Sequence, residues 1–150
     1  MKIEKILIKV SGDLIYNKKV LNEIKDISGD KSKTVHLIYG FGTIFSNALT
    51  ERKIPFKYVN DIRETTDGGL RIGLNISNDI ETYLRRYFNN SISLISPIEN
   101  RDGKIINTNA DEIVMQHYHE YDKVIIYTLK NRIKEKFNKI NNLEIRYIIT

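Results

Sequence analysis

The first residues that could carry chemistry lie in a short turn near the N-terminus, which contains Lys9, Ser11 and Gly12. The turn follows an apolar, β-branched run and precedes a helical pattern, so we expect Lys9 near the carboxyl end of a strand. A lysine there can reach a phosphate, and the backbone amides of Ser11 and Gly12 can face the same anion. The same residue types also suit a tight strand-to-helix connection. The turn therefore indicates either a phosphate site or a purely structural turn.

A second turn, Gly40-Phe41-Gly42, lies between the next strand pattern and the next helix pattern. Glycine allows the backbone to approach an anion because no Cβ intervenes. The turn is not a dinucleotide fingerprint, because the third glycine and the acidic residue at the end of the second strand are missing. It is not a Walker loop either, because Gly-Lys-Ser/Thr is absent. We therefore expect an anion-binding turn of another kind.

Three further polar residues, Arg63, Asn107 and Asp111, fall in or beside predicted loops. An arginine in such a loop can hold a carboxylate through two parallel hydrogen bonds, or it can lie on the surface. Asn107 can hydrogen-bond a ligand while Asp111 orients lysine donors around it. The alternative is that Asn109 or Asp111 only caps the following helix.

The elements that must position these residues alternate between strand and helix patterns. The predicted strands are residues 3–10, 34–39, 56–59, 91–96, 123–128 and 143–149. The predicted helices are residues 20–28, 44–49, 70–88, one that opens at 109–111, and 131–140, the last with Ile133, Phe137 and Ile140 on one face. Residues 61–69 are predicted as a loop, and Asp102-Gly103 as a hairpin turn. This order is typical of an α/β three-layer αβα sandwich with a mostly parallel sheet, and 150 residues suit a single domain over residues 1–150. Ligands of such sheets lie beyond the carboxyl ends of the strands, where the glycine turns fall.

The composition excludes several classes of function. The chain has no cysteine, which rules out disulfides and thiolate zinc sites and favours a cytoplasmic location. No apolar stretch is long enough for a membrane span or a signal-peptide core, so we expect no membrane partner. His117 and His119 lie two residues apart on a predicted helix and point to nearly opposite sides, so we expect no metal site.

The net charge of +5 is concentrated at the C-terminal end. From position 130 onward the chain has two acidic residues, Glu135 and Glu144, and six basic ones: Lys130, Arg132, Lys134, Lys136, Lys139 and Arg146. Such a run is usually a solvated helix face. It can also be a docking surface for nucleic acid or an acidic partner. No nucleic-acid motif lies nearby, so we do not expect a nucleic-acid partner.

Five motifs, in order, resemble the amino-acid kinase family. The likeness is greatest to the N-acetylglutamate kinases, and the first glycine turn is also similar to that of uridylate kinases. The resemblance covers nearly all of the chain, and residues 92–113 match most specifically. The motifs are Lys9-x-Ser11-Gly12, Gly40-Phe41-Gly42, Ile62-Arg63-Glu64-Thr65, Ile95-Ser96-Pro97 and Asn107-x-Asn109-Ala110-Asp111.

The resemblance implies an ATP-dependent phosphotransferase, working with Mg²⁺ on a carboxylate, carbamate or phosphate acceptor. It implies that Lys9 and Asp111 are catalytic, and that Lys9, Ser11 and Gly12 bind phosphate. It implies a homodimer that pairs through the helix at residues 70–88. The residues implied to bind the acceptor are Gly40, Phe41, Gly42, Arg63 and Asn107.

Two departures from the family pattern leave alternatives open. Phe41 stands where the family has glycine, so its ring either fills part of the acceptor pocket or points into the core. The family's nucleotide-binding lobe and second catalytic lysine have no clear counterpart, and Lys130, Lys134 and Lys136 are substitutes without a motif. The chain is then either a minimal kinase or a non-catalytic ligand-binding or regulatory protein derived from a kinase lobe. A third reading is a partner-binding module that uses the basic C-terminal segment.

Overall fold

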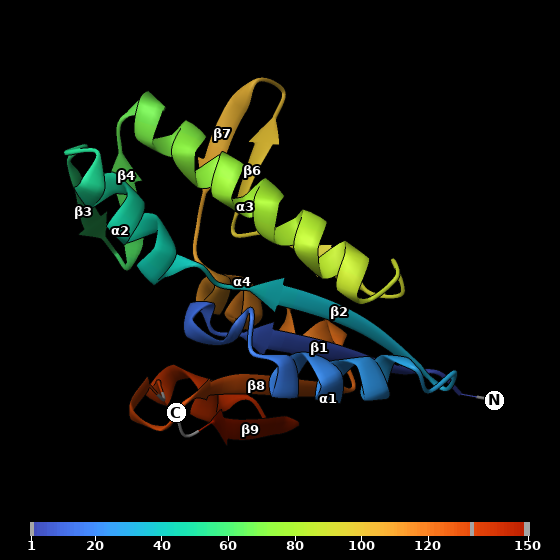
Figure 1. Ribbon diagram of the computed structural model, residues 1–150. Coiled ribbons are helices and arrows are strands. Elements are labelled where there is room, and N and C mark those ends of the chain that lie inside the picture. The colour runs from blue at the N-terminus through green and yellow to red at the C-terminus, as the bar shows by residue number, and fades with distance from the viewer. Residues whose placement is uncertain (1, 133, 149–150) are drawn as a thin grey trace.

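The computed structural model describes residues 2–132 and 134–148, and its centre is a five-stranded sheet (Figure 1). The strand order is β5-β2-β1-β8-β9, and every neighbouring pair is parallel. The predicted αβα sandwich with a mostly parallel sheet is confirmed. The strands of this sheet are β1 (Glu4–Val10), β2 (Lys33–Tyr39), β5 (Ser93–Ile95), β8 (Lys123–Leu129) and β9 (Leu143–Ile148).

Helices cover both faces of the sheet, and the alternation of side chains along β1 separates the two sides. Ile6, Ile8 and Val10 belong to a core that α1 (Lys18–Ser28) and α3 (Asp67–Tyr87) cover. Leu7 belongs to a second core on the opposite face, under α4 (Ala110–His117). Lys9 has the same parity as Leu7, so its side chain lies on the α4 face. This register brings Lys9 to Asp111, which is in the first turn of α4.

A hairpin replaces part of the loop predicted at residues 61–69, so that prediction is wrong. The hairpin consists of β3 (Phe56–Val59) and β4 (Ile62–Thr65), and α3 begins two residues later. Its turn residues Asn60 and Asp61 have φ angles of 52° and 65°, in the left-handed region that asparagine and aspartate tolerate. Three of the four residues of β4 are polar, and Arg63 is the one buried residue of the two strands, which explains the weak strand pattern. The hairpin predicted at Asp102-Gly103 is confirmed by β6 (Ile98–Arg101) and β7 (Lys104–Asn107).

The helix predicted over residues 131–140 is also wrong. The segment forms two short 3₁₀ turns, η3 (Lys130–Arg132) and η4 (Glu135–Lys139), and Lys134 between them has an extended backbone. Lys134 reaches Asp111 and Phe137 is buried beneath α4, so tertiary contacts override a weak helical pattern. Ile133 and Ile149, which were predicted in this helix and in the last strand, lie outside the described residues.

The remaining predicted helices are present. The shorter elements are α2 (Gly42–Glu51), η1 (Gly12–Leu14) and η2 (Tyr118–Glu120). His117 ends α4 and His119 lies in η2, so the two histidines do not share one helix as predicted. Among the described residues, no helix combines the length and the apolar character needed to cross a bilayer.

Candidate functional site

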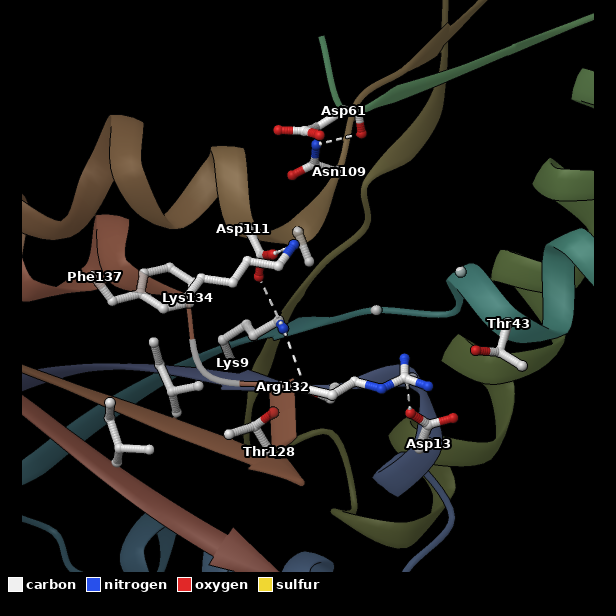
Figure 2. Close-up of a pocket in the computed structure, with 17 residues that line it drawn as sticks. Lys9, Asp13, Thr43, Asp61, Asn109, Asp111, Thr128, Arg132, Lys134 and Phe137 are labelled. Atoms are coloured by element: carbon white, nitrogen blue, oxygen red, sulfur yellow. Dashed lines mark hydrogen bonds and ion pairs between the residues drawn. The ribbon is translucent and has the colours of Figure 1, made fainter. Parts of the chain in front are cut away.

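A cavity of about 210 Å³ lies at the carboxyl ends of β1, β2 and β8. In a parallel sheet this is the edge at which ligands bind. Its walls come from the turn after β1, the start of α2, the start of α4 and the segment after β8 (Figure 2). The polar side chains that line it are Lys9, Ser11, Asp13, Thr43, Asp61, Asn109, Asp111, Thr128, Arg132 and Lys134. The sheet edge at which the glycine turns predicted a ligand site therefore contains a cavity.

The two glycine turns pack directly against each other. A Cβ on Gly12 would lie 3.0 Å from the Cα of Phe41, and a Cβ on Gly40 would lie 3.3 Å from the amide nitrogen of Gly12. The two backbones therefore approach so closely that a Cβ at either position would require its neighbour to shift by a few tenths of an ångström. The amides of Ser11 and Gly40 are also committed, since they donate to the carbonyls of Tyr127 and Val10 at 3.0 and 2.9 Å. Part of the glycine pattern thus serves the turns themselves, and these two amides do not face a ligand.

Lys9 and Asp111 form a buried ion pair at the floor of the cavity. The Lys9 Nζ lies 2.9 Å from Asp111 Oδ1 and donates a hydrogen bond of 3.2 Å to Ser11 Oγ. The 2.9 Å approach does not have hydrogen-bond geometry, so Oδ1 is a buried acceptor without a hydrogen-bond donor among the described residues. Lys134, half-exposed, lies 2.5 Å from the other oxygen, Oδ2. Figure 2 shows Asp111 between the two lysines.

The ionisation of Asp111 follows from these neighbours. Burial by itself raises the pKa of the carboxyl, but the positive charges of Lys9 and Lys134 beside it outweigh burial, so the pKa of Asp111 lies below its ordinary value. The helix is capped by Asn109, whose side chain accepts a 2.7 Å hydrogen bond from the amide of Glu112. Asp111 is therefore free of the capping role and holds the two lysines as a carboxylate.

The segment after β8 adds two charges to the site: Arg132, which the sequence did not assign to it, and Lys134, which the sequence named only as one of three substitutes without a motif. Arg132 lies 3.3 Å from Asp13 at the cavity, and the buried Thr128, the residue before the last of β8, also lines it. The lining then carries three basic side chains, Lys9, Arg132 and Lys134, and three acidic ones, Asp13, Asp61 and Asp111. The position of Thr128 at a strand end was a usable signal. The pairings of Arg132 and Lys134 had no sequence signal, because the segment was expected to be a helix.

Arg63 and Asn107 lie beside a second, smaller cavity of about 80 Å³, lined also by Phe41 and Phe45. The Nη2 of Arg63 donates to the carbonyl of Gly42 at 2.9 Å, to Ser46 Oγ at 2.6 Å and to the Tyr58 hydroxyl at 2.7 Å. The side-chain amide of Asn107 donates to the backbone carbonyl of Arg63 at 2.8 Å. The structure therefore brings these two predicted residues together, next to the cavity that Lys9 lines.

The solved structures that share this fold include the following three. N-acetylglutamate synthase from Neisseria gonorrhoeae, complexed with coenzyme A and N-acetyl-glutamate, is 13% identical with a TM-score of 0.68, over 89% of this chain and 43% of the synthase. The synthase complexed with coenzyme A and L-arginine is 12% identical with a TM-score of 0.67, over 89% and 45%. The protein smu.665 from Streptococcus mutans UA159 is 18% identical with a TM-score of 0.65, over 83% and 72%. No protein-family model matches the chain, and a search of the curated proteins found no significant match.

These likenesses show only the fold, because the sequence identities are too low to indicate a shared function. The chain also spans less than half the length of the synthase that it matches. Beyond the fold, the comparison shows only that the similar synthase structures hold small molecules, namely coenzyme A with N-acetyl-glutamate or L-arginine.

The comparison contradicts the predicted family and reaction. The similar structures with a named activity are a synthase that holds coenzyme A, not a kinase that holds ATP. The predictions of an amino-acid kinase, of ATP with Mg²⁺ and of phosphoryl transfer are therefore wrong. The alternative of a regulatory protein derived from a kinase lobe rested on the same family and falls with it. The physical reason is that glycine turns and isolated charged residues at strand ends recur across parallel sheets, so they indicate a site but not its chemistry.

The basic C-terminal segment pairs largely within the chain. Besides the contacts of Arg132 and Lys134, Lys136 lies 3.9 Å from Glu112 in α4. Arg146 contacts Glu144 and lies 3.5 Å from Glu23 in α1. Most of the charge that suggested a docking surface therefore faces carboxylates of this chain.

Proposed function

We propose that the chain binds a small anionic molecule, with a carboxylate or phosphate group, in the cavity above Lys9. The observation that carries this proposal is the buried Lys9 ammonium at the carboxyl edge of the sheet. An ammonium has three N–H donors. Among the described residues, Lys9 donates one hydrogen bond, to Ser11 Oγ, and forms an ion pair with Asp111 that lacks hydrogen-bond geometry. At least one donor therefore remains for a ligand.

The shape of the cavity limits the ligand to a small molecule. Its volume of about 210 Å³ lies below the roughly 300–1,000 Å³ of pockets that hold drug-sized ligands. Coenzyme A, which the similar synthases hold, is larger than such ligands and is not part of this proposal. A molecule of the size of an amino acid or an acylated amino acid fits this range better.

The charges of the lining favour an anion that approaches from the Lys9 side. Asp111 holds Lys9 and Lys134 in place, so a ligand anion would meet two oriented ammonium groups without paying to order them. The half-exposed Lys134 has donors to spare, since within residues 2–132 and 134–148 it forms one ion pair, with Asp111. In this proposal Lys9 and Lys134 bind the anion, and Asp111 is a positioning residue.

The neighbouring turns and Arg63 complete the proposed site. Gly12 and Gly42 expose backbone at the rim, and Ser11 supports Lys9 through its hydroxyl. Arg63 and Asn107 stand at the far end, beyond Gly42, where a second polar group of the ligand would lie.

We also retain the predicted cytoplasmic location and the predicted homodimer through α3 as parts of the proposal.

Calorimetric titration tests the proposal with three probes: inorganic phosphate, acetate and N-acetyl-glutamate. The expected result is a dissociation constant of about 1 mM or tighter for at least one probe, which corresponds to about 4 kcal/mol. The double variant Lys9→Met/Asp111→Asn removes the lysine donor without leaving a buried carboxylate unpaired. We expect it to lose at least tenfold in affinity.

The matched control is Lys31→Met, which removes an exposed lysine far from the cavity and should bind like the wild type. The proposal fails if the wild-type chain binds none of the three probes. It also fails if the double variant binds them as tightly as the wild type does.

A further inference from the structure

The floor of the larger cavity continues from Lys9 across the sheet toward β9. In the register of the parallel strands, Lys9 of β1 lies opposite Ile126 of β8, and Ile126 lies opposite Ile145 of β9. Paired residues of neighbouring strands project from the same face of a sheet, and the strands lie roughly 5 Å apart. All three residues line the cavity. A positive charge and two isoleucines therefore form one row along its floor.

The apolar end of this row has accessible surface. Ile126 is 1% exposed, and Phe137, which also lines the cavity, is 3% exposed, so the core under α4 covers most of both. Ile145 is only half-buried and lines the same cavity. Figure 2 shows Phe137 and Thr43 on opposite sides of Lys9. The cavity therefore extends from the ammonium in two directions, and the direction toward β9 contains a partly exposed aliphatic side chain.

The opposite direction, toward β2, gives the larger cavity no comparable apolar surface among the described residues. The neighbour of Lys9 on that side is Ile38, which is 0% exposed under α4. The Phe41 ring is 3% exposed and packs between the rings of Tyr39 and Phe45, whose centres lie 6.1 and 5.9 Å away. Of the two alternatives that the sequence left open, the ring therefore packs into the core. The second glycine turn lines the larger cavity through its two glycines.

The charges at the Lys9 end match a single negative charge. Lys9 and Lys134 contribute two positive charges and Asp111 contributes one negative charge, so the three groups together carry +1. Arg132 and Asp13 form a separate ion pair and balance each other. A carboxylate carries one negative charge, whereas a phosphate monoester carries about 1.5 to 2 at neutral pH. A monoanion therefore neutralises this group of charges without excess.

We infer that the anion bound at Lys9 is a carboxylate with a short aliphatic chain, and that the chain lies over Ile126 and Ile145. The inference rests on the proposed function, because the anion at Lys9 anchors the chain. It names the ligand class as short aliphatic carboxylic acids. An inorganic anion would leave Ile145 in water, whereas an attached aliphatic chain covers it, and removing apolar surface from water is favourable.

The test titrates the wild-type chain with acetate, propionate, butyrate and pentanoate by calorimetry. The affinity should rise by roughly two- to fourfold for each added CH₂ group, because each group buries apolar surface. NMR of the chain with labelled isoleucine methyl groups locates the contact. The terminal methyl group of butyrate should give a nuclear Overhauser effect to the Ile145 methyl groups.

Two variants of nearly identical shape separate this contact from a general preference for longer acids. Valine and threonine are both β-branched, and they differ in a methyl group against a hydroxyl group. Ile145→Val should retain the rise in affinity with chain length. Butyrate should bind about threefold more weakly to Ile145→Thr than to Ile145→Val, whereas acetate should bind alike to the two variants. The methyl contact is measured in the wild type, so the test does not depend on either variant folding.

The outcomes distinguish this inference from the proposed function. If acetate or phosphate binds the wild type but the affinity does not rise with chain length, the inference is wrong and the anion site remains. The inference is also overturned if the rise is equal in Ile145→Thr and Ile145→Val, or if the butyrate methyl contacts other isoleucines and not Ile145. If none of the acids and no phosphate binds, the proposed function fails and the inference fails with it.

Discussion

Lys9 and Arg63 are both buried cations in one site, but the fold stabilises their charges in different ways. Lys9 lies 2.9 Å from the carboxylate of Asp111, which is itself shared with Lys134. Arg63 has only neutral acceptors and aromatic faces around it in the described structure. A buried charge is tolerated when it is paired or well hydrogen-bonded. At the Lys9 end, paired charges therefore hold one another in place. At the Arg63 end, the guanidinium packs against aromatic rings and, among the described residues, retains a donor without a partner.

The largest effect should come from breaking the paired charges at the Lys9 end. Replacing Asp111 by alanine leaves Lys9 buried without a counter-charge, and removing one partner of a buried ion pair costs about 3–5 kcal/mol. We expect that loss in the free energy of unfolding, measured by urea denaturation. Lys9→Met/Asp111→Asn should recover part of it because neither charge is then stranded. Equal stability of Asp111→Ala and wild type would show that Lys9 does not depend on this carboxylate.

A smaller effect is expected at Arg63, because its removal strands no charge. Arg63→Met keeps an apolar stem against Phe45 and Phe56 but loses the hydrogen bonds to Gly42, Ser46 and Tyr58. We expect a loss of about 1–3 kcal/mol in the same urea measurement. A loss larger than that of Asp111→Ala would reverse the comparison and make Arg63 the main anchor of the site.

Acid should destabilise the Lys9 end through Asp111. The folded-state pKa of Asp111 lies below its ordinary value of about 3.9. A carboxyl with a lowered folded pKa stabilises the fold above its unfolded pKa, and that contribution is lost as the pH falls through the folded pKa. Unfolding measured between pH 7 and pH 2 should therefore show a loss below about pH 4 that is reduced in Asp111→Asn. An unchanged pH profile in this variant would place the acid sensitivity elsewhere.

The layers of the fold could be predicted because strand and helix patterns alternate along the sequence, and each pattern is set by local residues. The buried residues of β1 and β2 are mostly apolar on both faces, which is what a sheet covered on both sides requires. The β3–β4 hairpin was missed because three of the four residues of β4 are polar, although Asn60-Asp61 is a turn pair that tolerates positive φ. Reading that pair as a hairpin turn would have placed Arg63 on a strand.

Of the candidate site, only the residues at or facing the ends of strands could be predicted from the sequence. Lys9, Gly12, Gly40 and Asp111 follow or face the carboxyl ends of parallel strands, and the structure brings them together. The contact of Lys134 with Asp111 depends on how the chain crosses from β8 to β9, which no local pattern encodes. The kinase prediction was wrong for a related reason, since short motifs at strand ends reflect the architecture shared by many parallel sheets.

The central claim is that a small anion binds at the glycine turns above Lys9. Backbone-amide NMR of the ¹⁵N-labelled chain during titration with N-acetyl-glutamate and inorganic phosphate tests it most directly. We predict saturable shifts for at least one probe that are largest at Gly12, Gly42 and Thr43, and that are lost in Lys9→Met/Asp111→Asn. Shifts confined to exposed lysines such as Lys31 and Lys139, or no shifts with either probe, would contradict the claim.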